Sequence, residues 1–307
     1  MLEIGAVSAA LLGAAAYGTG DFIGSRAALR LSTFSAVAIA QTVAMVLMLQ
    51  HFLTDGGAMP TGALFSSSVL AGLAYASGLM LLYHGFAHGR IGVVAPLCGL
   101  FSILVPLAGE LLVGEGTTEW HLIGIALCCL AVVFIAGSTR DRNGRLGFSV
   151  RLGVLSGVGY GVADLCLGIM PAEAASGALL TTRSVAALTA TGLLCWSLAR
   201  RSAIRSAEAE GAGPPLAALL DVGRPRFALR LHHGVLLAVL AGIFDMLGHI
   251  GYVSAAVAGN MGVAAALVAL FPAVSVVLAI LFLNERISRS QAVGFACSIA
   301  GVFLLAE

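Results

Sequence analysis

Long apolar segments recur along almost the whole of this chain, separated by short polar stretches. Each is long enough to cross the roughly 30 Å hydrocarbon core of a bilayer as an α-helix, which takes about 20 residues. The sequence therefore predicts an all-α integral membrane protein of ten transmembrane helices. Their approximate bounds are 4–25, 33–53, 62–87, 91–113, 119–138, 150–170, 174–199, 233–257, 261–283 and 288–306.

The composition leaves no soluble alternative. Of the 307 residues, 59% are hydrophobic and 10% are charged, whereas soluble domains carry about 25% charged residues. A bilayer accepts such a chain because each helix satisfies its own backbone hydrogen bonds. The net charge of +1 gives no reason to expect a nucleic-acid partner. The expected partners are the lipid bilayer and a small-molecule substrate, and no cofactor is predicted.

The chain contains two copies of one pattern. The segment YGTGDF at 17–22 matches YGVADL at 160–165, which lies 143 residues further on. A second match runs without a gap from 92–115 onto 262–285, at a distance of 170 residues. Internal similarity of this kind indicates a fold built from structural repeats.

Each copy holds five predicted helices, with residues 1–140 as the first repeat and 141–307 as the second. Because five is odd, the second copy enters the membrane from the opposite side. Inverted repeats are typical of transporters, which bind their substrate near the midplane between the copies. An Arg-, Ala- and Pro-rich stretch at 200–232 is expected to be a mobile, solvated loop in the second repeat.

The positions of arginine predict the orientation. Fifteen of the 16 basic residues lie in or beside the connections that follow odd-numbered helices, and the exception, Arg183, is inside the seventh. Basic loops remain in the cytoplasm. The chain is therefore expected to be a multi-pass protein of the plasma membrane with both termini outside.

Ionisable residues at membrane depth are candidates for function, because each raises the free energy of insertion by about 2.5–3.5 kcal/mol. Asp21 and Asp164 occupy equivalent places in the two copies and are candidates for paired gates or for proton or substrate contacts. Tyr17 and Tyr160 precede them by four residues on the same helix faces, where they could contact a ligand. Helix capping for the aspartates and core packing for the tyrosines are the alternatives.

Two further pairs stand four residues apart. Asp245 and His249 share a face of the eighth predicted helix, where they could line a cavity or relay a proton. His84 and His88 lie at the cytoplasmic end of the third, where a solvated position is the alternative. Together the four residues offer metal-type ligands, but such pairs arise easily by chance, and no metal site is predicted.

Arg183 cannot lose its charge, so inside a helix it needs an anionic partner or an aqueous cavity. Asp164 lies at a similar depth. The alternatives are a structural ion pair and a site for the carboxylate of a substrate. Glu115 and Glu285 follow the fourth and ninth predicted helices and are interpreted as helix N-terminal caps.

Three segments carry a resemblance to a known family. They are YGTGDFIGSRAALRLS in the first helix, GRIGVVAPLCGLFSILVPLAGELLVGE over the third and fourth, and GNMGVAAALVALFPAVSVVLAILFLNERIS over the eighth to tenth. The chain resembles the EamA-type transporters of the drug/metabolite transporter superfamily over nearly all of its length. The resemblance implies two inverted five-helix repeats, a central cavity and alternating access, usually for the export of amino acids, other metabolites or drugs.

The function expected is a secondary transporter that moves a small metabolite, amino acid or drug, as a monomer or homodimer. One alternative is an intramembrane metalloenzyme using His84, His88, Asp245 and His249, although no nucleophile or metalloprotease motif supports it. A second is a membrane partner or sensor protein that interacts through the Arg-rich stretch at 200–232.

Overall fold

The computed structural model describes residues 4–113, 145–168, 170–209, 228–258 and 270–305, together with 267, 268 and single residues between 120 and 134. The described residues form helices and connections and contain no strand. The helices are α1 (Ile4–Arg30), α2 (Thr33–Asp55), α3 (Gly62–His88), α4 (Ile91–Val113), α6 (Arg145–Gly168), α7 (Ala172–Ala209), α8 (Ala228–Ala258), α10 (Phe271–Leu283) and α11 (Arg289–Leu305).

Six of these helices are long and apolar enough to cross a membrane: α1, α2, α3, α6, α7 and α8. Shorter apolar stretches lie in α4 and α10. The predicted fifth helix at 119–138 falls largely outside the described residues, although those described there, such as Trp120 and Ala131, are helical. The first part of the predicted ninth helix, before Leu267, also lies outside them.

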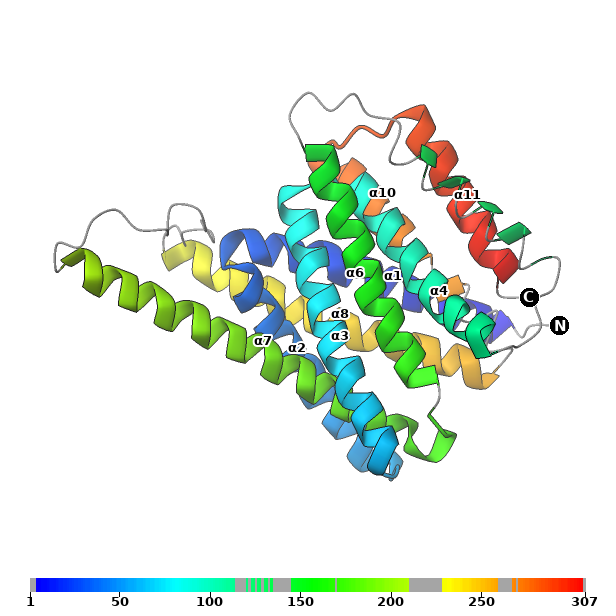
Figure 1. Cartoon of the computed structure of the whole chain (residues 1–307), viewed down its shortest axis with the longest axis horizontal. Helices are drawn as coiled ribbons and strands as arrows, with labels where there is room; N and C mark the ends of the chain where they lie inside the picture. The colour runs from blue at the N-terminus through cyan, green and yellow to red at the C-terminus, as the bar shows by residue number, and fades with distance from the viewer. Residues whose placement is uncertain are drawn as a thin grey trace.

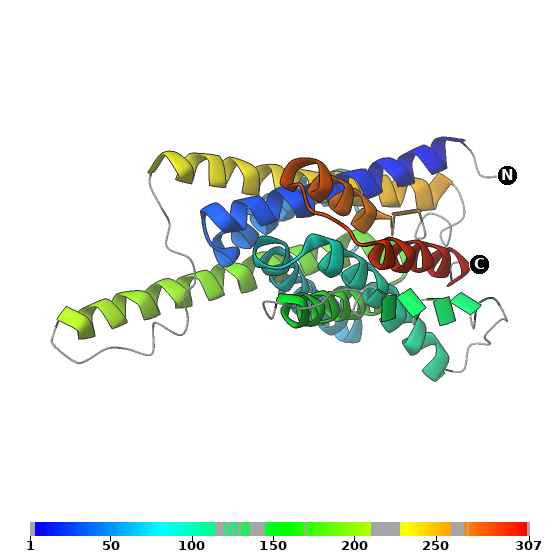
Figure 2. The ribbon, with the colours of Figure 1, turned by 90° about the horizontal axis from the view of Figure 1, so that it is seen from above.

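The predicted loop at 200–232 is wrong at both of its ends. Helix α7 continues to Ala209, and α8 begins at Ala228. The stretch that continues α7 is rich in Ala and Arg, which have high helix propensities. Figures 1 and 2 show the end of α7 projecting beyond the other helices. Residues 210–227 lie outside the described part of the chain.

The helices pack in matched pairs (Figures 1 and 2). Helix α1 packs on α8, and α6 packs on α3. Helix α2 contacts α7 and α8, while α7 contacts α2 and α3. Helix α1 also packs on α10, and α6 on α4. Exchanging α1 with α6, α2 with α7, α3 with α8 and α4 with α10 therefore maps this set of contacts onto itself, and the α2–α7 contact is its own counterpart.

Small residues bring these helices close together. A Cβ atom added to Gly251 of α8 would lie 2.7 Å from Cα of Gly13, and one added to Gly159 of α6 would lie 2.8 Å from Cα of Gly78. Gly153, Gly157 and Gly161 recur every four residues along α6, and added Cβ atoms there would meet the backbone of α4. Close backbone approach of this kind is typical of helices that associate within a membrane.

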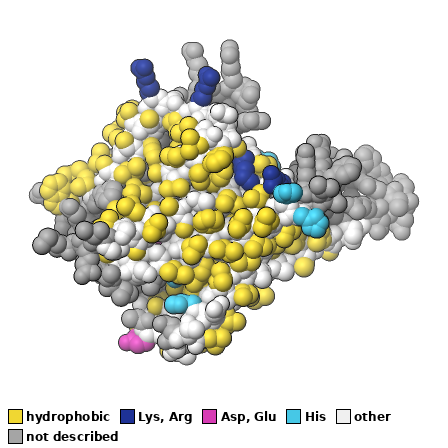
Figure 3. All heavy atoms as spheres, turned by 180° about the vertical axis from the view of Figure 1, so that it is seen from behind, with side chains coloured by type: hydrophobic (Ala, Val, Ile, Leu, Met, Phe, Trp, Pro, Cys, Tyr) yellow, Lys and Arg dark blue, Asp and Glu magenta, His cyan; other side chains and the backbone are white. Residues whose placement is uncertain are grey.

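The surface separates apolar from charged regions. Figure 3 shows a face covered largely by hydrophobic side chains, with arginine side chains toward one end and an acidic side chain at the other. One end of the bundle holds Arg30 at the end of α1, Arg90 before α4, Arg286 before α11 and Arg289 at its start. We refer to this end, where α4 begins at Ile91, as the arginine end.

Candidate functional site

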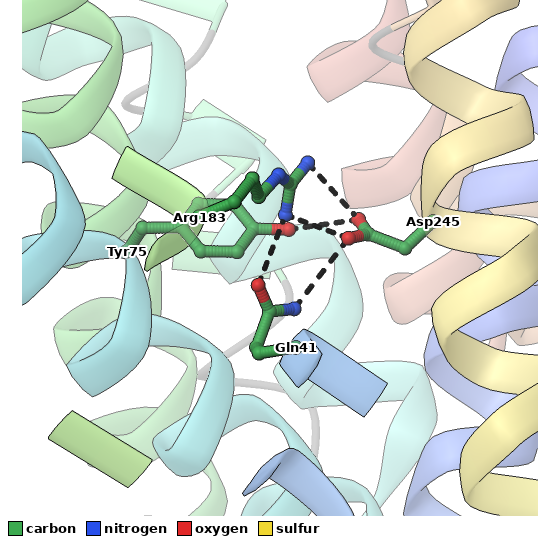
Figure 4. Close-up of polar contacts among 4 residues, drawn as sticks. All are labelled: Gln41, Tyr75, Arg183 and Asp245. Carbon is green, nitrogen blue, oxygen red and sulfur yellow. Dashed lines mark hydrogen bonds and ion pairs between the residues drawn. The ribbon is translucent and has the colours of Figure 1, made fainter. Parts of the chain in front are cut away.

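Four helices each contribute one polar side chain to a cluster inside the bundle. Gln41 comes from α2, Tyr75 from α3, Arg183 from α7 and Asp245 from α8 (Figure 4). Gln41 is 0% exposed, Arg183 is 5% exposed and Asp245 is 8% exposed. We call these four residues the axial cluster.

Asp245 accepts hydrogen bonds from the three other members. Arg183 Nη1 lies 2.6 Å from Asp245 Oδ2, and Nη2 lies 3.4 Å from Oδ1. The Tyr75 hydroxyl donates to Oδ1 over 2.8 Å, and Gln41 Nε2 donates to Oδ2 over 3.5 Å. Arg183 Nη1 also donates to Gln41 Oε1 at 3.3 Å, which closes the network.

The cluster satisfies the arginine in two ways. The guanidinium carbon of Arg183 lies 4.4 Å from the centroid of the Tyr75 ring, within the range of a cation–π interaction. The carboxylate of Asp245 supplies the opposite charge. A buried charge without a partner raises the free energy of the folded state by several kcal/mol, roughly 3–5 in measured cases. Arg183 and Asp245 therefore depend on each other for burial.

Glycine contacts reveal how the cluster relates to the repeats. An added Cβ at Gly72 of α3 would lie 2.8 Å from the carbonyl oxygen of Thr182 in α7. One at Gly242 of α8 would meet the carbonyl oxygen of Ala40 in α2 in the same way. Gly242 lies 170 residues after Gly72, the same separation as in the second sequence match.

The residues that follow these carbonyls are Arg183 and Gln41, so the two occupy equivalent places. They are 142 residues apart. Tyr75 and Asp245, which are 170 residues apart, are likewise equivalent. The axial cluster therefore consists of two related pairs, each with one member from each half of the chain.

Comparison with known proteins identifies the family. A sequence model of the EamA-like transporter family matches residues 4–137 and 147–306. The chain belongs to this family. It is thus a multi-pass membrane transporter of the drug/metabolite type, as its apolar helices also indicate.

A solved crystal structure supports the fold of this EamA-like transporter. It covers 97% of this chain and 96% of its own, with a TM-score of 0.54 at 16% sequence identity. A comparison with curated protein sequences gives no match.

The structure gives Arg183 a partner that differs from the neighbour suggested by its depth in the sequence. Arg183 pairs with Asp245, whereas Asp164 is exposed and forms no hydrogen bond with the axial cluster among the described residues. His249 is 8% exposed and lies one turn after Asp245. Within the described ranges no hydrogen bond joins these two, since the bonds of Asp245 go to α2, α3 and α7.

The predicted tyrosines lie beside the cluster. The Tyr160 ring packs edge-to-face on Tyr75, with ring centroids 5.1 Å apart. Tyr17 packs against Phe271 at 6.5 Å, and its ring lies where a Cβ on Gly248 would be. Both tyrosines are therefore placed at the contacts between α1 and α8 and between α6 and α3.

The two equivalent aspartates differ in their surroundings. Asp21 is half-buried in α1, which packs on α3, α8 and α10. Asp164 in α6 is exposed. Neither takes part in an ion pair among the described side chains. Their roles as gates or as proton or substrate contacts stay predictions.

The histidines of α3 stand apart from this site. His84 stacks on His88 with ring centroids 4.4 Å apart, and its Nδ1 lies 3.4 Å from the Thr33 hydroxyl at the arginine end. No three His, Cys, Asp or Glu residues of the described chain are placed to hold a metal ion. His84 and His88 are thus not joined to Asp245 and His249 as the metalloenzyme alternative requires, and members of this family are transporters.

Gln41 and Tyr75 were not predicted from the sequence. Gln41 is an uncharged polar residue in an apolar helix, and Tyr75 reads as a core aromatic. Gln41 can be identified by aligning the sequences of the second and seventh helices, which matches TVA at 42–44 with SVA at 184–186. That alignment places Gln41 opposite Arg183, the charged residue that the sequence did single out.

The predicted cap at Glu285 is confirmed, and it joins the two halves. Glu285 Oε2 accepts from the backbone N–H of Ile91, and Oε1 accepts from that of Gly92, both at 3.1 Å. These donors belong to the first turn of α4, which has no intrahelical acceptors for them. Glu115, the predicted counterpart, lies outside the described residues.

Proposed function

We propose that this protein is a secondary transporter that moves a small metabolite, amino acid or drug across the plasma membrane by alternating access. In this proposal ten helices form two inverted repeats, residues 1–140 and 141–307. The substrate binds between them, beside the axial cluster. The direction proposed is export.

One observation carries the proposal. The axial cluster joins two equivalent pairs, Gln41 with Arg183 and Tyr75 with Asp245, through a buried ion pair. It lies where α2, α3, α7 and α8 meet, which is where a two-fold relation would exchange the repeats. Transporters with inverted repeats bind substrate near such a midplane and rock one repeat against the other around it.

Each neighbouring residue has a proposed role. Arg183 and Asp245 hold the repeats together and present charge to the substrate, and His249 lines the cavity beside them. Tyr17 and Tyr160 contact the substrate through their rings, since an aromatic side chain offers an apolar face and a polar hydroxyl. Proton or substrate contacts at Asp21, near one mouth, and Asp164, near the other, are proposed from their equivalence in the repeats. His84 would contribute from the arginine end.

The arginine distribution supports an orientation with the arginine end in the cytoplasm and both termini outside. A cysteine at Gly168, at the far end of α6, should react with an impermeant maleimide added to intact cells. A cysteine at Arg30 should not. The reversed pattern would overturn this orientation.

The experiment that tests transport begins with ligand binding. Amino acids, organic cations and organic anions are screened for stabilisation of the purified protein, because a ligand at 100 times its Kd stabilises the folded state by about 2.7 kcal/mol. Each hit is then offered to proteoliposomes, where the wild-type protein should give saturable flux that empty liposomes lack.

The double variant Arg183→Gln/Asp245→Asn tests the site without leaving a single buried charge. We expect it to fold and to lose most of the flux. Glu173→Gln, which changes an exposed carboxylate in the first turn of α7, is the matched control and should keep it. Flux that is unchanged in the double variant would remove the axial cluster from the mechanism, and binding without any flux would contradict the transporter itself.

A further inference from the structure

The arginine end is closed by packing between the two halves of the chain. Helices α1, α3 and α4 of the first half and α10 of the second contribute to one buried cluster, made of Phe22, Leu82, Phe86, Ile91, Val94, Ala95, Cys98, Val276 and Ala279. The rings of Phe22 and Phe282 lie 6.1 Å apart across the same contact. Apolar packing of this extent excludes water from the arginine end.

Polar contacts seal the rim of this apolar cluster. Arg26 Nη2 donates to the Phe86 carbonyl at 2.8 Å, which links α1 to α3. Arg90 Nη2 donates to the Arg286 carbonyl at 3.4 Å, across the two halves. The Glu285 carboxylate makes two contacts across the halves at this end, to the first two N–H groups of α4, both at 3.1 Å. The Arg90 N–H also crosses the halves and donates to Ser149 Oγ at 3.0 Å.

The chain is shaped to deliver this carboxylate. Helix α10 ends at Leu283, and Asn284 then adopts a left-handed conformation with φ 53°. The turn is held by the Glu285 N–H, which donates to the Ala279 carbonyl at 3.2 Å. Asn tolerates this conformation better than most residues. Glu285 is therefore directed away from its own helix and toward α4.

We propose that Glu285 is a latch that holds the arginine end closed and releases α4 when that end opens. This inference rests on the proposed alternating access, and it adds the device that controls one of the two gates. A carboxylate at a helix N-terminus is stabilised by the helix dipole and by charge-assisted hydrogen bonds. When the halves separate, water can hydrogen-bond to both the carboxylate and the freed N–H groups, so the latch is reversible.

The native thiol of Cys98 reports on this gate. It is 0% exposed, belongs to the buried apolar cluster, and lies seven residues into α4, about 10 Å along the axis from the latched end. A hydrophilic maleimide should reach it only when the arginine end opens. Modification is followed on the Cys98 peptide by mass spectrometry, so the other cysteines stay in place.

The test compares the wild-type protein with Glu285→Gln, which removes the charge and one of the two carboxylate acceptors. We expect the rate of Cys98 modification to rise at least about tenfold, since loss of a charge-assisted hydrogen bond shifts an equilibrium by that order. Glu173→Gln makes the same change at an exposed site and should leave the rate unaltered. Glu285→Asp, which keeps the charge on a shorter side chain, should give an intermediate rate.

The readout needs no substrate, so the latch and the transport function can fail separately. Thermal unfolding transitions establish that wild type and Glu285→Gln are both folded. An equal rate of Cys98 modification in these two proteins would then overturn the latch without contradicting the transport function. An increased Cys98 rate in a protein that moves no ligand would retain the latch as a closing contact while contradicting the transport function. If Glu285→Gln does not fold, the rate in Glu285→Asp decides, and no increase there overturns the latch.

Discussion

Asp245 shows how strongly single residues in this bundle depend on their neighbours. Its carboxylate accepts from Arg183, Tyr75 and Gln41, which come from three other helices. A substitution at Asp245 therefore disturbs the packing of four helices as well as any contact with a substrate. Stability and transport must be measured together when this residue is changed.

A double-mutant cycle at the ion pair gives the first prediction. Asp245→Asn leaves the Arg183 charge buried and unpaired and should lower the free energy of unfolding by about 3–5 kcal/mol. Arg183→Gln should have a similar effect on Asp245. The variant with both changes should be more stable than the sum of the two losses, by about 0.5–3 kcal/mol. Unfolding of the four proteins in the same detergent measures this coupling.

Two results would contradict the prediction. If the losses are additive, the 2.6 Å contact carries no coupling and the cluster is not a unit. If the single variants are as stable as the wild type, the two charges are not buried in the membrane. Glu173→Gln serves as the control for a general effect of removing a carboxylate and should change stability by less than about 0.5 kcal/mol.

For single residues, the sequence predicted that the buried arginine needs an anionic partner, but it did not predict which residue that partner is. Arg183 needs an anionic partner because its charge is permanent, and it forms an ion pair with Asp245. Depth along the helices suggested Asp164 as the neighbour, but depth does not specify which helices are adjacent or how they are rotated. Gln41 and Tyr75 carry no charge, so nothing in the sequence of one helix distinguishes them from ordinary polar and aromatic packing.

The close contacts of α1 with α8 and of α6 with α3 predict that added methyl groups at their glycines destabilise the protein. Gly251→Ala should place a methyl group against the backbone of Ala9 and Gly13, and Gly159→Ala against that of Ala74 and Gly78. Backbone cannot move aside as a side chain can, so each substitution should destabilise the protein by about 1–3 kcal/mol. Thermal unfolding compares the two variants with the wild type.

Gly192→Ala is the matched control within α7, because nothing lies within 4 Å of the added methyl group. Its higher helix propensity should leave stability unchanged or raise it by up to about 1 kcal/mol. Equal effects at all three positions would mean that α1–α8 and α6–α3 are not close contacts. No loss at Gly159 would mean that α6 and α3 do not approach closely at this position.

The helices themselves followed from hydropathy where the apolar runs are flanked by polar residues, as for α1, α2 and α3. The end of α7 could not be predicted from hydropathy, since a hydropathy pattern reports membrane depth and not helicity. The residues after Arg200 leave the apolar run but are rich in Ala and Arg, which favour helix, so the helix continues to Ala209. The internal match at 17–22 and 160–165 predicted equivalent helices, and α1 and α6 do make equivalent contacts.

At the scale of the whole molecule, one half of the chain closes on the other at two levels. The axial cluster joins the halves in the interior, and Glu285 joins them at the arginine end. In the proposed alternating access, the contact at Glu285 opens while the axial cluster serves as the pivot. A covalent bond across the arginine end should therefore stop transport without disturbing the axial cluster.

The pair Gly92→Cys and Ile287→Cys provides that bond. An added Cβ at Gly92 lies 3.5 Å from Cγ1 of Ile287, the atom that a cysteine sulfur would replace. A disulfide places the Cβ atom of one cysteine about 3 Å from the sulfur of the other, so a small shift closes the bond. Each single variant keeps the backbone N–H of residue 92, so the Glu285 latch remains available in all three proteins.

The direct test is flux of a stabilising ligand into proteoliposomes, measured for the Gly92→Cys/Ile287→Cys protein before and after reduction. We expect little or no flux in the oxidised form, recovery to the wild-type rate on addition of reductant, and normal flux in both single variants. Undiminished flux through the fully cross-linked protein would contradict alternating access at the arginine end.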